Sequence, residues 1–111
     1  MVDIDQTICL TPFVDGKHRY ELSVPFRHRI EEINKLYDQG HTIKYWTARG
    51  SGSGIDWTEL TTQQLNDWDC KFHEVRVGKP SYDIWIDDKA ISDKDFFAIA
   101  DRSIFPGFED E

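Results

Sequence analysis

The sequence has few cysteines, few basic residues and no long apolar run, and each shortage excludes a class of protein. Its two cysteines, Cys9 and Cys70, belong to no Cys-x-x-Cys pair, which argues against a zinc knuckle and against a disulfide framework. Nowhere do about eighteen apolar residues run together, as a membrane-spanning helix requires, and the N-terminus lacks a signal-peptide pattern. We therefore expect a soluble, cytoplasmic protein with two free thiols and no membrane partner.

Basic residues are outnumbered by acidic ones. The chain has 13 Lys and Arg against 21 Asp and Glu, a formal net charge of −8, and such a field makes long nucleic acid an unlikely partner. The length of 111 residues and the 39% hydrophobic content suit one globular domain. We expect a single domain over residues 1–111, with a loose acidic tail over 106–111.

Apolar patterning predicts short strands separated by helices. The strand-like stretches are residues 1–4, 41–46, 72–77 and 82–86. Strands that alternate with helices favour an α/β fold with a mostly parallel central sheet. Sites in such sheets lie at the carboxyl ends of the strands.

Helical spacing and turn residues place the remaining elements. A helix is expected from Pro25 to Gly40, another after Thr58 or Thr61, and a short one after Ser92. The interval of about residues 8–24 carries the dipeptide Asp15-Gly16 between two strand-like stretches. That dipeptide favours a tight hairpin turn, so this interval predicts a small flap.

Each predicted strand is followed by polar residues that suit phosphate chemistry. Asp3 and Asp5 follow the first strand, and an aspartate beside a metal can accept a phosphoryl group while a second acts as general acid and base. The later strands are followed by a hydroxyl with two amides, then by an ammonium group, then by two acids: Thr47, Ala48 and Arg49; Lys79; Asp87 and Asp88. Four converging carboxylates repel one another without a cation, and Mg²⁺ prefers such oxygen ligands.

The order Asp-x-Asp-x-Thr, Thr47, Lys79, Asp87-Asp88 resembles the four motifs of the haloacid dehalogenase superfamily of phosphatases. The resemblance covers nearly the whole chain and implies a Rossmannoid three-layer sandwich. It implies that Asp3 is the nucleophile, that Thr47 and Lys79 hold the phosphate, and that Asp87 and Asp88 bind Mg²⁺ together with Asp3 and Asp5. Asp5 would also be the general acid and base. Gln6 stands where the family commonly has glycine.

Too few residues separate Thr7 from Pro25 to hold a cap domain, so the chain looks like a capless member. Capless relatives shield the site with flaps or neighbouring subunits, so we expect the hairpin to act as a lid and the chain to form homo-oligomers. The four histidines have no metal-ligand spacing and are expected to be structural, while Trp57 is expected to pack.

The function that follows is hydrolysis of a phosphomonoester through an aspartyl-phosphate, with Mg²⁺ as cofactor and a small phosphorylated metabolite as substrate. A sugar phosphate is the first choice, because Trp57 and Arg49 lie near an open site. A nucleotide or polynucleotide 3′-phosphatase is the alternative, since the loop from Thr47 to Gly54 resembles that of polynucleotide kinases. A non-hydrolytic phospho-receiver or metal-binding module is the rival from another class.

Overall fold

The computed structural model describes residues 1–80, 82 and 84–104, so the predicted acidic tail lies outside the described residues. The side chains of residues 103 and 104 are also outside the description. In chain order the elements are β1 (Cys9–Leu10), β2 (Phe13–Val14), β3 (Lys17–His18), the 3₁₀ turn η1 (Tyr20–Leu22), β4 (Val24–Pro25), α1 (Arg27–Asp38), β5 (Lys44–Trp46), α2 (Thr58–Asp67), β6 (Glu74–Arg76), α3 (Asp93–Phe96) and α4 (Ala98–Ile104).

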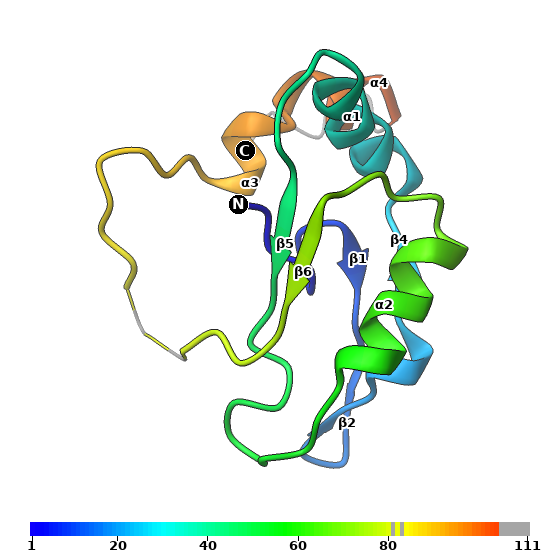
Figure 1. Ribbon diagram of the computed structural model, residues 1–111, viewed down its shortest axis with the longest axis vertical. Coiled ribbons are helices and arrows are strands. Elements are labelled where there is room, and N and C mark those ends of the chain that lie inside the picture. Colours follow the sequence, from blue (N-terminus) through cyan, green and yellow to red (C-terminus); the bar gives the residue numbers. More distant parts are fainter. Residues whose placement is uncertain (81, 83, 105–111) are drawn as a thin grey trace.

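A short parallel sheet organises the site. Strands β5 and β6 pair in parallel, with Tyr45 opposite Val75. The predicted N-terminal strand is reduced to one parallel bridge between Val2 and Tyr45. The Val2 amide donates to the Lys44 carbonyl at 2.8 Å, and the Trp46 amide donates to the Val2 carbonyl at 2.9 Å. The chain is therefore an α/β protein, and the three segments end at the same edge of the sheet (Figure 1).

The helices bury their apolar faces against this sheet. Ile30 and Ile33 of α1, Leu65 of α2 and Tyr45 of β5 belong to one buried cluster. The predicted helices are confirmed, and Ser92 caps α3 by accepting a hydrogen bond from the Asp95 amide at 3.2 Å. No helix in the described part of the chain is long and apolar enough to cross a membrane.

The predicted flap is a pair of antiparallel ladders, one nested inside the other. β1 pairs with β4 at its base, and β2 pairs with β3 at its tip. Asp15 and Gly16 join β2 to β3 with φ angles of 54° and 75°. Both angles are positive, as the turn dipeptide predicted. The base of the flap begins at Cys9, shortly after Asp3 and Asp5 in the chain.

The predicted strand over residues 82–86 is wrong for the described part of that range. Residues 82 and 84–86 form no strand, and the side chains of Ile84 and Ile86 are 77% and 92% exposed. Trp85 meets Trp46 edge-on, with 6.2 Å between ring centroids. The segment therefore contacts the end of β5 through aromatic side chains. A strand requires backbone hydrogen bonds to a neighbouring strand, and an apolar composition alone does not provide them.

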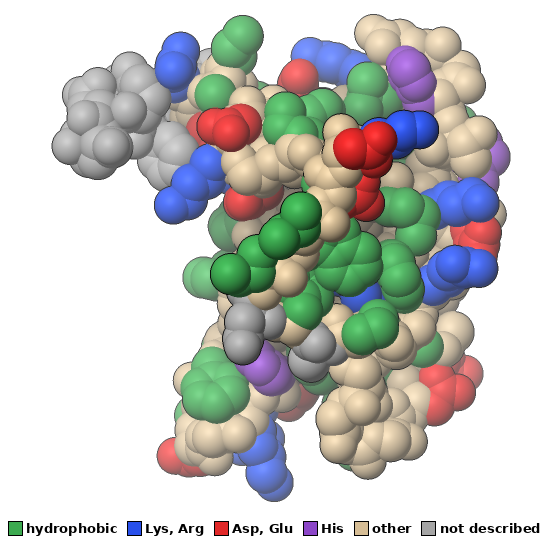
Figure 2. Space-filling model, turned by 90° about the vertical axis from the view of Figure 1, so that its left-hand side faces the viewer, with side chains coloured by type: hydrophobic (Ala, Val, Ile, Leu, Met, Phe, Trp, Pro, Cys, Tyr) green, Lys and Arg blue, Asp and Glu red, His purple; other side chains and the backbone are tan. Residues whose placement is uncertain are grey.

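This segment extends away from the sheet, as the yellow trace in Figure 1 shows. Figure 2 views that side of the molecule and shows hydrophobic side chains gathered in the middle of the face, with acidic and basic side chains around them. Exposed apolar side chains of the segment and its surroundings include Ile84, Trp85, Ile86, Ile91 and Phe96.

Candidate functional site

The first two candidate acids, Asp3 and Asp5, lie on either side of Ile4, where a tight turn begins. The amides of Thr7 and Ile8 both donate to the Ile4 carbonyl, at 3.1 and 2.9 Å. Gln6 adopts a φ of 64°, a conformation that favours glycine. Its amide donates to the Cys9 carbonyl at 2.8 Å and its side chain donates to the Thr11 carbonyl at 3.0 Å. These bonds offset the strain and explain how glutamine occupies a position that suits glycine.

Asp3 is the candidate acid with the more accessible carboxylate. Its side chain is 41% exposed, and Thr7 Oγ1 donates to its Oδ2 at 3.2 Å. Lys79 Nζ lies 3.5 Å from Asp3 Oδ1, and the Lys79 side chain is only 13% exposed. The Lys79 amide also donates to the Thr47 carbonyl at 2.9 Å, so the end of β5 fixes the backbone of the lysine. An accessible carboxylate thus sits beside a nearly buried ammonium group.

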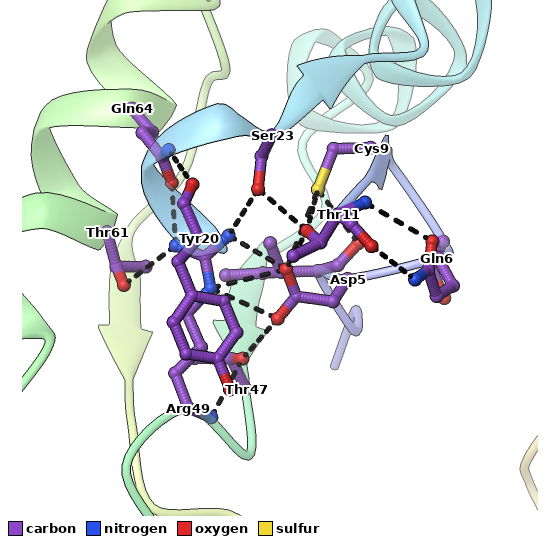
Figure 3. A network of polar contacts seen from close by, with 12 residues as sticks. Asp5, Gln6, Cys9, Thr11, Tyr20, Ser23, Thr47, Arg49, Thr61 and Gln64 are labelled. Atoms are coloured by element: carbon purple, nitrogen blue, oxygen red, sulfur yellow. Dashed lines mark hydrogen bonds and ion pairs between the residues drawn. The ribbon is translucent and has the colours of Figure 1, made fainter. Parts of the chain in front are cut away.

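Asp5, by contrast, is held by Arg49, whose side chain is fully buried. Arg49 Nε donates to Asp5 Oδ2 at 3.0 Å and its Nη2 donates to Oδ1 at 2.8 Å. The remaining guanidinium donor, Nη1, contacts Gln64 Oε1 at 2.6 Å and Thr61 Oγ1 at 3.2 Å, both on α2. Figure 3 shows the guanidinium at the centre of this network. Arg49 therefore joins the acidic turn to α2.

These contacts determine the protonation state of Asp5. Burial alone would raise the pKa of its carboxyl, but hydrogen bonds and the charge of Arg49, with further bonds from Thr11 and Thr47, outweigh burial and lower that pKa. Thr47 Oγ1 donates to Asp5 Oδ2 at 3.3 Å. Asp5 is consequently ionised at neutral pH and acts as an acceptor of hydrogen bonds.

The loop after β5 presents backbone donors at the same place. The Arg49 amide donates to Thr47 Oγ1 at 3.2 Å, whereas the Ala48 amide donates to no residue that the structure describes. Gly50 closes the loop with a φ of 83°, and a Cβ there would lie 2.2 Å from the Ile55 carbonyl oxygen. Only glycine fits this bend, and the bend keeps the exposed Ala48 amide at the edge of the site.

A cavity of about 200 Å³ lies over these residues, lined by Asp3, Asp5, Gln6, His18, Tyr20, Thr47, Ala48 and Arg49. The sequence predicts eight site residues; five of them line the cavity, Asp3, Asp5, Thr47, Ala48 and Arg49, and another, Lys79, contacts Asp3. It does not predict Gln6, which follows Asp5, or His18 and Tyr20, which the flap brings to the cavity. The flap prediction was the one available signal, because a lid must place some of its side chains over the site.

Asp87 and Asp88 do not join this group. Both are exposed, neither lines the cavity, and Asp87 Oδ1 accepts a hydrogen bond from the Lys89 amide at 2.9 Å. Across residues 1–80, 82 and 84–104 there is no group of three or more His, Cys, Asp or Glu that could hold a metal ion. Of the four predicted metal ligands, the structure brings together Asp3 and Asp5.

Cys9 is a buried free thiol whose Sγ lies 3.8 Å from Asp5 Oδ1, and Cys70 is a free thiol in the core. Burial raises the pKa of each thiol to about 11. Both therefore stay protonated at neutral pH and are poor nucleophiles. The prediction of two plain thiols is confirmed, and neither thiol competes with Asp3 as a nucleophile.

No protein-family model matches the chain, and no curated protein does. Among solved structures, the chain is similar to a structural-genomics target from Vibrio cholerae, with a TM-score of 0.71 and 25% sequence identity. The match covers 86% of this chain and 83% of that one. This likeness supports the α/β fold over most of the chain.

Proposed function

We propose that this chain is a Mg²⁺-dependent phosphomonoester hydrolase of the haloacid dehalogenase type, acting on a small sugar phosphate through an aspartyl-phosphate on Asp3. One observation carries the proposal. The accessible carboxylate of Asp3 shares a cavity with Thr47 and with Ala48, whose amide donates to none of the described residues, and it lies beside Lys79. The finer architecture, a Rossmannoid three-layer sandwich with a mostly parallel central sheet, belongs to the same proposal.

The chemistry begins with a carboxylate attacking phosphorus. An oxygen of Asp3 forms the new bond to phosphorus as the bond to the ester oxygen breaks, which leaves an acyl phosphate on the protein. The ester oxygen departs with the bonding electron pair and takes a proton from solvent water to become the free alcohol. Lys79 and the Ala48 amide are donors placed to stabilise the charge on the non-bridging oxygens. Water then attacks the acyl phosphate and releases inorganic phosphate and the free Asp3.

Asp5 suits the second of these steps. Because Arg49 lowers the pKa of its carboxyl, Asp5 is an ionised acceptor that can take a proton from the attacking water. An ionised carboxylate does not donate a proton to a leaving group. We therefore expect esters with a good leaving group, such as aryl phosphates, to react without that assistance.

The cavity supplies only part of a magnesium site. Asp3 offers accessible carboxylate oxygens of the kind Mg²⁺ prefers, but both Asp5 oxygens are taken by Arg49, Thr11 and Thr47, and Asp87 and Asp88 lie elsewhere. When bound, the ion would neutralise charge between Asp3 and the phosphate.

Hydrolysis of p-nitrophenyl phosphate by the full chain tests the proposal. With Mg²⁺ we expect turnover that EDTA abolishes and that Asp3→Asn lowers on the order of 10³-fold or more, because the nucleophile is lost. Asp15→Asn is the matched control, since Asp15 lies exposed at the flap tip and asparagine tolerates its positive φ. It should keep wild-type activity.

Four results would contradict the proposal, the last of them in its substrate class alone. Equal rates for Asp3→Asn and the wild-type protein would remove Asp3 as the nucleophile. A stable phosphorylated chain without turnover would favour the phospho-receiver, and Mg²⁺ binding without hydrolysis would favour the metal-binding module. Faster hydrolysis of nucleotides or polynucleotide 3′-phosphates than of sugar phosphates would favour the alternative substrate class.

A further inference from the structure

The flap places a row of aromatic rings beside the cavity. Phe13 meets His18 edge-on at 4.9 Å between ring centroids, and His18 stacks on Tyr20 at 5.6 Å with 15° between the ring planes. Tyr20 meets Trp57 edge-on at 5.0 Å. Two members of this row, His18 and Tyr20, line the cavity together with the acids. The row thus runs from the flap tip to the start of α2, and its middle forms part of the cavity wall.

Tyr20 is fixed by the same residues that fix Asp5. The Arg49 guanidinium lies over the Tyr20 ring, 4.8 Å from its centroid. Gln64 Nε2, on α2, donates to the Tyr20 carbonyl at 2.6 Å. One buried arginine therefore sets the positions of an acid and an aromatic side chain at the same cavity, as Figure 3 shows. This wall of the cavity is built before a ligand arrives.

The packing of the rings limits what the wall can recognise. A guanidinium and an imidazole both lie against the Tyr20 ring, and Phe13 and Tyr20 both contact His18, so little ring face is left for stacking a nucleobase. The Tyr20 hydroxyl and the His18 ring nitrogens have no hydrogen-bond partner among the described residues. Polar edges are what this wall offers, and such edges pair with hydroxyl groups.

The size of the cavity also favours a sugar or polyol phosphate over a nucleotide. Its volume of about 200 Å³ is below the roughly 300–1,000 Å³ of common small-molecule sites. A phosphate with one sugar ring or a short polyol suits that space better than a nucleotide does. The Tyr20 phenol also remains a donor at neutral pH, since burial and the charge of Asp5 raise its pKa.

We propose that His18 and Tyr20 form the subsite for the leaving group, and that their polar edges bind the hydroxyl groups of a sugar or polyol phosphate. This inference rests on the proposed function, because it assigns the part of the cavity that the phosphate does not fill. Specificity then comes from the flap, whereas Asp3 and Lys79 act on every phosphomonoester.

Two substrates separate this subsite from the phosphate site. Glucose 6-phosphate carries hydroxyl groups on its sugar ring, and p-nitrophenyl phosphate carries none on its leaving group. We expect Tyr20→Phe and His18→Ala each to lower kcat/KM for glucose 6-phosphate about 3- to 10-fold, mainly through a higher KM, because each removes one hydrogen bond. For p-nitrophenyl phosphate, whose leaving group has no hydroxyl group to bind, the loss in kcat/KM should be smaller than the loss for glucose 6-phosphate in each variant.

Val14→Ala is the matched control, because Val14 is an exposed flap residue that does not line the cavity. It should leave kcat/KM unchanged for both substrates. Thermal unfolding checks that all three variants fold. Direct binding is measured with Asp3→Asn, which retains the flap. In that background glucose 6-phosphate should bind more tightly than inorganic phosphate, and Tyr20→Phe should reduce the difference.

The outcomes distinguish the two proposals. Equal losses on both substrates, no loss on either, or a nucleoside monophosphate preferred to glucose 6-phosphate would overturn the subsite while leaving the phosphatase intact. A wild-type chain that hydrolyses neither ester and binds glucose 6-phosphate no better than inorganic phosphate would overturn both. Tight binding without hydrolysis would support the subsite and contradict the proposed reaction.

Discussion

Arg49 is the residue that links Asp5 to the wall of the cavity. From the sequence, its side chain could fork onto the substrate phosphate or a distal carboxylate, or could pair locally at the surface. In the structure its guanidinium is fully buried and contacts Asp5, Ser23, Thr61 and Gln64. Its direct contact with substrate stays a prediction. These contacts give Arg49 a positioning role: it keeps Asp5 ionised and fixes the Tyr20 ring.

Replacing Arg49 by lysine tests that role through the pH dependence of turnover. Lysine keeps the charge but cannot make the two-pronged contact, so burial should then raise the pKa of Asp5. Because Asp5 must be ionised to accept a proton, the acidic limb of the kcat profile should move to higher pH. We expect Arg76→Lys, at an exposed arginine, to leave the limb unchanged. An unshifted limb in Arg49→Lys would refute the coupling.

At the scale of elements, a buried ion-pair network ties the C-terminal helices to the acidic turn. Arg29 of α1 contacts Asp101 of α4 through Nε and Nη2 at 3.0 and 2.6 Å. Its Nη1 donates to the Thr7 carbonyl at 3.0 Å and contacts Asp93 of α3 at 2.9 Å. His28 Nε2 also lies 2.7 Å from Asp101. The backbone next to the candidate nucleophile thus depends on helices near the far end of the chain.

Asp101→Asn should destabilise the fold strongly. Removing the Asp101 charge leaves the buried Arg29 with the partly exposed Asp93 as its acidic partner, and breaking a buried pair costs up to about 3–5 kcal/mol of unfolding free energy. Asp38→Asn is the control, since the exposed pair of Asp38 with Lys71 is worth about 0–1 kcal/mol. Urea denaturation at pH 7 measures both. Similar losses in the two variants would show that the Arg29 network contributes little.

For the whole molecule, the two acids held by buried arginines determine how stability depends on pH. The pKa of Asp5 and that of Asp101 are both lowered: burial opposes the shift, and the bonds to Arg49 and Arg29 outweigh it. The two aspartates contribute fully to stability when the pH is above their pKa in the unfolded chain, about 3.9. This contribution is lost as the pH falls through their lower pKa values in the folded protein. The urea midpoint should therefore be nearly flat from about pH 7 to 5 and fall below about pH 4. A fall already between about pH 7 and 5 would assign the loss to other groups.

The sequence predicted this molecule best where local signals suffice. The helices, the Asp15-Gly16 turn and the Ser92 cap depend on neighbouring residues, and all of them are confirmed. The clustering of Asp3, Asp5, Thr47 and Lys79 was predictable because each follows a strand or bridge of one parallel sheet. The finer architecture and the phosphatase itself stay predictions.

What the sequence could not provide are contacts between segments far apart in the chain. The burial of Arg49 depends on α2, and the entry of Tyr20 into the cavity depends on Gln64, which follows it by 44 residues. The segment over 82–86 has the composition of a strand, but pairing depends on a neighbour and not on composition. Long-range partners therefore decided every departure from the sequence expectation.

The exposed apolar face around Ile84, Trp85 and Ile86 affects how the protein behaves in concentrated solution. At low ionic strength, copies with a net charge of −8 repel one another over roughly 30 Å, which keeps these faces apart. Physiological salt shortens that range to about 8 Å, and sulfate further strengthens apolar contacts. Dilute buffers should therefore prolong storage, whereas ammonium sulfate should precipitate the protein readily.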